Sequence, residues 1–202
     1  YGGGQSPGPR LTRIPGDEMF RTSYRSGGRE GFLLFPHPFG TSTSTAVGGE
    51  RVCVSTGERF GIRCRSPDGR LLTVVRDSVR RRPVTDEAID RLLESRLADI
   101  EHQDLRRRVR ESFESVRDFP DRMPALDRLL IGSEGDLWVR AYRPEYEEGG
   151  RRWTVFGPDG IRRARVTMPP KFRPYVIERD LVVGQWTDEL GVNFVRVYRL
   201  GR

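Results

Sequence analysis

The residues that most often carry acid–base or nucleophilic chemistry are few in this chain of 202 residues. Its two histidines are His37, which lies between two prolines, and His102, which opens a charged stretch. Neither has a nucleophile motif nearby, so a Ser/His/Asp or Cys/His mechanism is not expected. We assign no catalytic residue and incline toward a protein that is not an enzyme.

The chain has two cysteines, Cys53 and Cys64, whose thiols could act as nucleophiles or metal ligands. They show no CxxC motif and no Cys/His spacing of the kind that holds zinc. Both fall on strands that we expect to be adjacent, so a cross-strand disulfide is sterically conceivable. We favour two unpaired, partly buried thiols.

Carboxylates are the remaining candidates for metal chemistry, because a calcium site needs several oxygen ligands that converge. The candidates in the C-terminal part are Glu134, Asp136, Glu178, Asp180, Asp188 and Glu189. Most of them occupy turn positions, where acidic residues serve solubility and turn bonding. We expect no metal site and no cofactor, and keep a metal-dependent hydrolase as the alternative.

Aromatic and arginine side chains offer a better basis for function. In the strand expected over 137–142, Trp138, Arg140 and Tyr142 alternate onto one face. Trp186 lies near the corresponding place in a later segment. Such residues either pack between sheets, the commoner role, or reach a rim and anchor a ligand. The candidate ligand-binding residues are therefore Trp138, Arg140, Tyr142 and Trp186.

The excess of positive charge reflects a general preference for arginine along the whole chain. The sequence holds 36 Lys and Arg against 29 Asp and Glu, a net charge of +7. Lys171 is the only lysine, and the arginines are spread along the chain with acidic neighbours between them. No nucleic-acid-binding motif accompanies the charge, so we expect no nucleic-acid partner. The tightest cluster of arginines, Arg80 to Arg82, is predicted to lie in a solvated linker.

An internal repeat organises most of the chain. Residues 51–75 and 136–168 each read as strands joined by turns, with the turn tetrapeptides SPDG at 66–69 and GPDG at 157–160. A third copy begins at residue 181 and stops before its outer strand. A short apolar stretch before each copy supplies one more strand. Four antiparallel strands in about 44 residues is the size of a propeller blade.

The gap between the first two copies is predicted to be helical. Thr85 is a good N-cap, Asp86 and Glu87 follow in the first turn, and Leu92, Leu93 and Leu97 share one face. A second amphipathic helix is expected over roughly 102–116. The apolar stripes either pack on the neighbouring blades, which we favour, or form an arm that binds a partner.

The expected fold is all-β, with blades of a propeller and a helical insert between them. The divisions are a loop and the end of an earlier blade at 1–40, a blade at 41–77, the helical insert and linker at 78–125, a blade at 126–170, and a last, incomplete blade at 171–202. Residues 20–39 read as two strands around a Gly-Gly turn, after a loop over 1–18. Three blades do not close a ring and would leave exposed edges. We therefore expect the C-terminal part of a longer propeller.

The PDG turns, the VTDEAIDRLLESRL helix, the FPDRMPALDRLLIGSEGDLWVR junction, the RRWTVFGPDG hairpin and the terminal FVRVYRL together resemble uncharacterised six-bladed β-propeller proteins of bacteria, similar to NHL-repeat and TolB-like propellers. The resemblance covers roughly residues 30–202. It implies a place in the cell envelope or periplasm, with a cytoplasmic place left open, and an anchoring lipid upstream.

Relatives within that resemblance include ligand binders, interaction platforms and metal-dependent lactonases with a site in the central channel. The function expected is a non-catalytic binding or scaffold protein whose partner is a protein, peptide or glycan. The alternative is a lactonase-like hydrolase. No transmembrane segment is expected in this chain.

Overall fold

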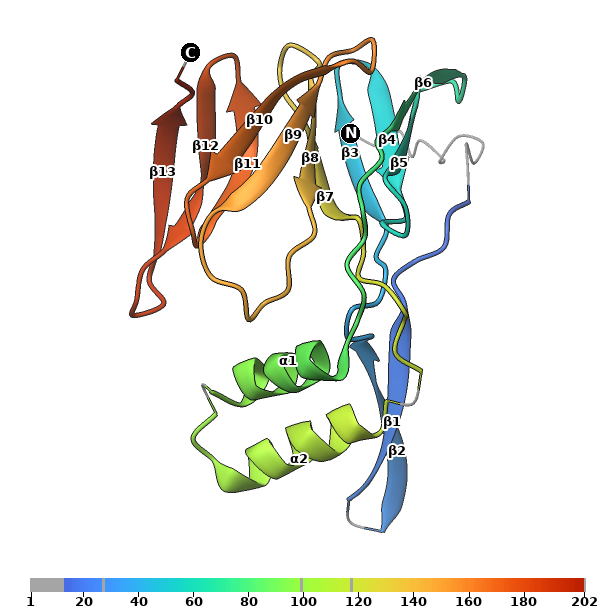
Figure 1. Cartoon of the computed structure of the whole chain (residues 1–202), viewed down its shortest axis with the longest axis vertical. Helices are drawn as coiled ribbons and strands as arrows, with labels where there is room; N and C mark the ends of the chain where they lie inside the picture. The colour runs from blue at the N-terminus through green and yellow to red at the C-terminus, as the bar shows by residue number, and fades with distance from the viewer. Residues whose placement is uncertain (1–12, 27, 99, 117, 202) are drawn as a thin grey trace, which may run out of the picture.

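The computed structural model describes residues 13–201 except residues 27, 99 and 117, and its main body consists of three antiparallel sheets side by side (Figure 1). The first sheet contains β3 (Ser44–Gly48), β4 (Arg51–Ser55), β5 (Gly61–Arg65) and β6 (Leu71–Arg76), paired in chain order. The SPDG turn at 66–69 joins β5 to β6, and Gly69 has the positive φ of 91° that this turn requires.

The second sheet confirms the prediction of four antiparallel strands over residues 126–168. It contains β7 (Leu126–Ile131), β8 (Leu137–Ala141), β9 (Arg151–Phe156) and β10 (Arg162–Met168), again paired in chain order. The GPDG turn joins the two outer strands, β9 and β10, as expected. The two PDG turns therefore occupy equivalent places in successive sheets.

The third sheet has three strands, which agrees with a copy that stops before its outer strand. They are β11 (Phe172–Glu178), β12 (Leu181–Thr187) and β13 (Asn193–Arg199). The first strands of the three sheets are neighbours in space, since β7 contacts both β3 and β11. Hydrogen bonds link these neighbours: Leu129 N donates to Ser44 Oγ at 2.8 Å, and Ser133 N donates to the Ile177 carbonyl at 2.9 Å.

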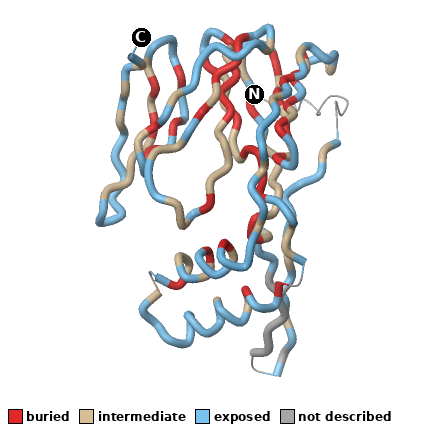
Figure 2. The backbone as a smooth tube through the Cα atoms, viewed as in Figure 1, coloured by how far each residue is buried: buried red, intermediate tan, exposed pale blue. Residues whose placement is uncertain are grey.

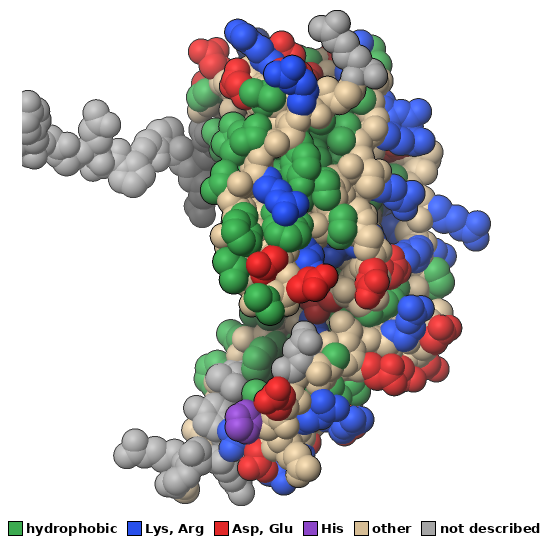
Figure 3. Space-filling view, turned by 90° about the vertical axis from the view of Figure 1, so that its left-hand side faces the viewer, with side chains coloured by type: hydrophobic (Ala, Val, Ile, Leu, Met, Phe, Trp, Pro, Cys, Tyr) green, Lys and Arg blue, Asp and Glu red, His purple; other side chains and the backbone are tan. Residues whose placement is uncertain are grey.

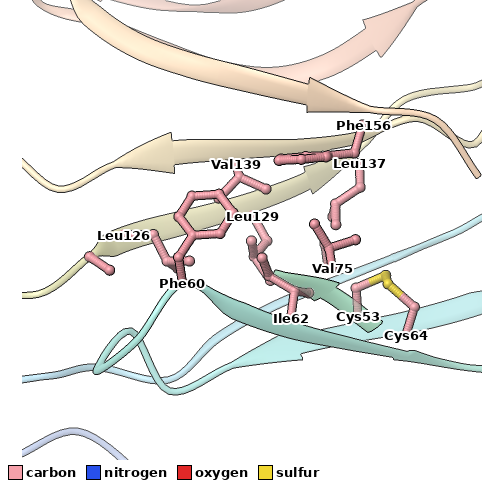
Figure 4. Packing of buried hydrophobic residues seen from close by; sticks show 12 residues of the cluster. Cys53, Phe60, Ile62, Cys64, Val75, Leu126, Leu129, Leu137, Val139 and Phe156 are labelled. Atoms are coloured by element: carbon pink, nitrogen blue, oxygen red, sulfur yellow. A yellow bond between two sulfur atoms is a disulfide. The ribbon is translucent and has the colours of Figure 1, made fainter. Parts of the chain in front are cut away.

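Two hydrophobic cores fill the spaces between consecutive sheets, where the buried residues gather (Figure 2). The first core lies between the first and second sheets and includes Ile62, Val139 and Phe156 (Figure 4). The second core lies between the second and third sheets and includes Trp138, Trp153 and Phe172. Alternate residues of β8 enter different cores, which explains why this strand is buried on both faces.

The cysteines form a disulfide, which corrects the expectation of two unpaired thiols. Cys53 on β4 and Cys64 on β5 are directly opposite in the register, with their Cα atoms 4.0 Å apart. Both point into the first core and are at most 1% exposed (Figure 4). The register therefore places the two sulfur atoms together on one face of the sheet.

The outer faces of the two terminal sheets carry exposed apolar side chains. On the third sheet, Val197 and Val176 both pair with Val183, so the three lie in one row across the sheet. Val197 is 58% exposed and Val195, two residues away on the same face, is 80% exposed. Figure 3 shows hydrophobic side chains gathered on this side of the molecule. On the first sheet, Val47 is 75% exposed.

The N-terminal strands were predicted around a Gly-Gly turn, and they form a separate hairpin beside the helices (Figure 1). β1 (Met19–Ser26) pairs with β2 (Arg29–Pro36), and among the described residues this two-stranded sheet pairs with no other sheet. Of the loop expected over 1–18, residues 13–18 have no helix or strand, and residues 1–12 lie outside the described residues.

The insert between the first and second sheets contains α1 (Asp86–Ala98) and α2 (Gln103–Glu114), which confirms the helical prediction. Thr85 caps α1, because its Oγ1 accepts a hydrogen bond of 3.2 Å from Ala88 N. A third core holds the helices against the rest of the chain. It joins Leu92 and Phe113 to Phe39, and packs against Tyr142 of the loop after β8.

Two linker segments run antiparallel between the sheets and the helices. Pro83 and Arg122 form an isolated β-bridge, and Arg81 donates from Nε to the Met123 carbonyl at 2.9 Å. Arg82 pairs with Glu147. Within the Arg80 to Arg82 cluster, Arg80 and Arg82 are exposed, as expected of a solvated linker, and Arg81 and Arg82 also bind groups of other segments. In the described part of the chain, neither helix has the length and apolar character to cross a bilayer.

Replacing Leu93 with Asp should lower the free energy of unfolding by about 2 kcal/mol, because this half-buried side chain packs on the third core. The measurement is the melting temperature, with Glu94→Gln as a control at the next, exposed position. An unchanged melting temperature in Leu93→Asp would mean that α1 is not held by this core.

Candidate functional site

A group of polar side chains lies where the first strands of the second and third sheets meet. Arg128 on β7 and Arg173 on β11 both approach the ring of Tyr175, with their Cζ atoms 5.7 Å and 5.6 Å from its centroid. Tyr175 donates from its hydroxyl to Gln185 Oε1 at 2.9 Å. We call these four residues, Arg128, Arg173, Tyr175 and Gln185, the β7–β11 site.

The local backbone explains how the site is assembled. β7 has a register irregularity between Leu126 and Arg128, and β11 has one between Pro174 and Val176. Such bulges re-aim side chains that regular pleating would send to the opposite face. Tyr175 lies in the second bulge and is 47% exposed. Its ring is therefore accessible at the surface between the two strands.

Two positive charges lie near each other in the site. Burial lowers the pKa of Arg128, and the nearby charges of Arg173 and Arg140 lower it further. Within the described residues, neither Arg128 nor Arg173 has a hydrogen-bonded or ion-paired carboxylate. The contacts of both guanidinium groups are with the Tyr175 ring, which attracts cations through its negative face.

An ion pair lies beside this site and has a different character. Arg140 Nε contacts Asp127 Oδ1 at 2.5 Å, and both side chains are about one-fifth exposed, at 22% and 21%. Burial raises the pKa of Asp127, although the charges of Arg140, Arg151 and Arg128 act in the opposite direction. Arg140 also lies over the Trp153 ring, 5.9 Å from its centroid.

The four sequence-predicted ligand residues do not come together in one site. Trp138 is 3% exposed and belongs to the second core, so it takes the packing role. Arg140 is engaged by Asp127, as described above. Tyr142 packs on the third core, and burial raises its pKa. The residues chosen from the sequence therefore lie in different environments and do not form a shared binding surface.

Trp186 is the fourth of these residues and has a separate environment. It is half-buried at the edge of the second core. The Arg196 guanidinium stacks on it, with Cζ 3.3 Å from the ring centroid, and Phe194 lies 6.0 Å away between centroids. Its ring therefore packs against Arg196, against its pairing partner Phe194 on β13, and against the edge of the second core.

The two histidines and Asp188 lie outside the β7–β11 site. His37 donates from Nδ1 to the Pro38 carbonyl at 2.9 Å, and His102 precedes α2. Asp188 accepts from Leu190 N and Val192 N, which closes the turn between β12 and β13. Over the described residues, no three His, Cys, Asp or Glu side chains gather as a metal-binding group.

The chain matches no protein-family model and no curated protein.

The residues of the β7–β11 site were missed by sequence reasoning. Arg128 and Arg173 each stand within the first strand of a repeat, in the segments LDRLLI and FRPYVIE, where apolar residues are otherwise frequent. A charged residue at that place in two consecutive repeats is the signal that could have revealed them. This signal indicates a shared site only when the first strands of the repeats are known to be neighbours.

Proposed function

We propose that this chain is a non-catalytic binding protein built from blades of a six-bladed β-propeller, and that the β7–β11 site takes part in recognition. Three consecutive sheets whose first strands are neighbours support the propeller interpretation. The exposed valines on the outer faces of the first and third sheets also support it, because further blades of a ring would cover those faces.

The observation that carries the binding function is the exposed ring of Tyr175 with two guanidinium groups close to it. Tyrosine and arginine are, with tryptophan, the residues enriched among the anchors of binding surfaces. The carboxylates considered for a hydrolase lie in turns and at strand ends, as Asp136 and Asp180 illustrate. This placement favours binding over catalysis.

We further propose a place in the cell envelope, which the Cys53–Cys64 disulfide supports. Structural disulfides persist in oxidising compartments such as the periplasm and are rare in a reducing cytoplasm. The partner is a protein, peptide or glycan that reaches the surface formed by β7 and β11.

Peptide and glycan arrays test the binding function, with retained probes recovered and analysed for chemical change. We expect unchanged probes, bound by the wild type and lost in Tyr175→Ala. Phe32→Ala is the matched control, because Phe32 is another exposed aromatic ring with an arginine over it, in the separate hairpin. Turnover that Asp136→Ala or Asp180→Ala abolishes would instead establish the hydrolase.

A further inference from the structure

The β7–β11 site holds two guanidinium groups for which the described residues supply no acceptor, while three arginines near them have acceptors in the chain. Arg140 binds Asp127, and Arg143 donates to the Gly149 and Gly150 carbonyls at 2.6 Å and 2.8 Å. Arg151 donates to the Arg143 carbonyl at 2.9 Å. These three neighbouring arginines therefore have acceptors from the chain, and among the described residues Arg128 and Arg173 have none.

Holding Arg128 and Arg173 on one ring is electrostatically unfavourable without an anion. Arg128 is half-buried, and its lowered pKa reflects both the loss of water and the charge of Arg173. A cation–π contact offsets only part of such a cost. Asp127 does not resolve it, because this carboxylate is bound by Arg140. An external anion would satisfy both guanidinium groups at once.

We propose that Arg128 and Arg173 together bind one oxyanion group of a ligand, a carboxylate or a phosphate, beside the Tyr175 ring. The inference rests on the proposed binding function and names the chemistry that the site recognises. Each guanidinium presents a planar fork of N–H donors that matches two oxygens of such a group. Gln185 accepts from Tyr175 through Oε1, which leaves its amide NH₂ as a further donor.

Isothermal titration of the full chain at low ionic strength tests the proposal with citrate and inorganic phosphate as probes. We expect saturable binding of at least one of them, and the stronger of the two identifies the carboxylate or the phosphate as the group recognised. Sodium chloride at matched ionic strength is the reference. Chloride would displace citrate or phosphate equally well if non-specific positive charge alone held these anions.

The variants are Arg128→Gln and Arg173→Gln, each expected to weaken binding about tenfold or more through loss of a charge-assisted hydrogen bond. Arg165→Gln is the matched control, because Arg165 is an exposed arginine on β10 of the second sheet. Arg173 is exposed, so its variant tests the site even if Arg128→Gln does not fold. Circular dichroism establishes which variants are folded.

Two results would overturn the proposal: no saturable binding of either probe by the wild type, or equal weakening by Arg165→Gln and Arg173→Gln. Neither result would contradict the broader binding function, because the arrays also detect the binding of uncharged probes. Conversely, probe turnover on the arrays would remove the non-catalytic function and leave the oxyanion contact as a substrate contact. The two proposals therefore fail separately.

Discussion

Replacing Trp138 with Ala is expected to lower the free energy of unfolding by about 3 to 5 kcal/mol, the usual cost of truncating a buried aromatic residue. For a chain of this length, the melting temperature should fall by roughly 6 to 20 °C. Trp138 is 3% exposed and packs in the second core, between the second and third sheets. Thermal unfolding followed by circular dichroism measures the effect.

Trp138→Phe is the matched control and should lose much less stability. The Nε1 atom of Trp138 is buried and has no hydrogen-bond partner, so phenylalanine removes no hydrogen bond and leaves a smaller cavity. A Trp138→Ala variant with wild-type stability and impaired ligand binding would contradict the packing role. It would return Trp138 to the recognition surface that the sequence suggested.

The strands and turns were predictable because their signals are local. In SPDG and GPDG, proline presets one dihedral angle of the turn and glycine accepts the positive φ of the last position. The two-residue period of a strand also predicted that neighbouring residues of β8 face opposite sides, and Trp138 enters the second core while Leu137 and Val139 enter the first. Thr85 marked the start of α1 through the hydrogen bond that it accepts.

The pairing of the cysteines depended on information that no local pattern carries. The sequence placed Cys53 and Cys64 on adjacent strands, but a shift of one residue in the β4–β5 register would send their side chains to opposite faces. The loop over 56–60 sets that register, and Gly57 in it adopts a positive φ of 74°. A bond between the sulfur atoms therefore became evident only with the sheet assembled.

The β7–β11 site was hidden for a similar reason. Arg128 and Arg173 are 45 positions apart in the printed sequence and come together only because β7 and β11 are neighbours. The bulges that re-aim Tyr175 and Arg128 also have no clear sequence signature. By contrast, the aromatic residues chosen from sequence were conspicuous for the size that suits them to the cores.

The second large effect is expected from Cys53→Ala combined with Cys64→Ala. The bond closes a loop between residues 11 positions apart, and constraining an unfolded chain over such a loop stabilises the folded state by about 3 kcal/mol. The loss of two buried sulfur atoms adds to this cost, because both side chains lie in the first core. The double variant should therefore melt well below the wild type.

A reducing agent separates the contribution of the bond from that of the packing. Reduction should lower the melting temperature of the wild type and leave that of the double variant unchanged, since the variant has no thiol.

Thiol titration of the denatured wild type should find no free thiol before reduction and two afterwards. Citrate and phosphate binding should persist in the folded variant, because the first sheet contributes no residue to the β7–β11 site. If the melting temperature of the fully reduced wild type equals that of the oxidised protein, the bond adds no stability. Two free thiols before reduction, in protein isolated from its own cells, would remove the support that the disulfide lends to a place in the cell envelope.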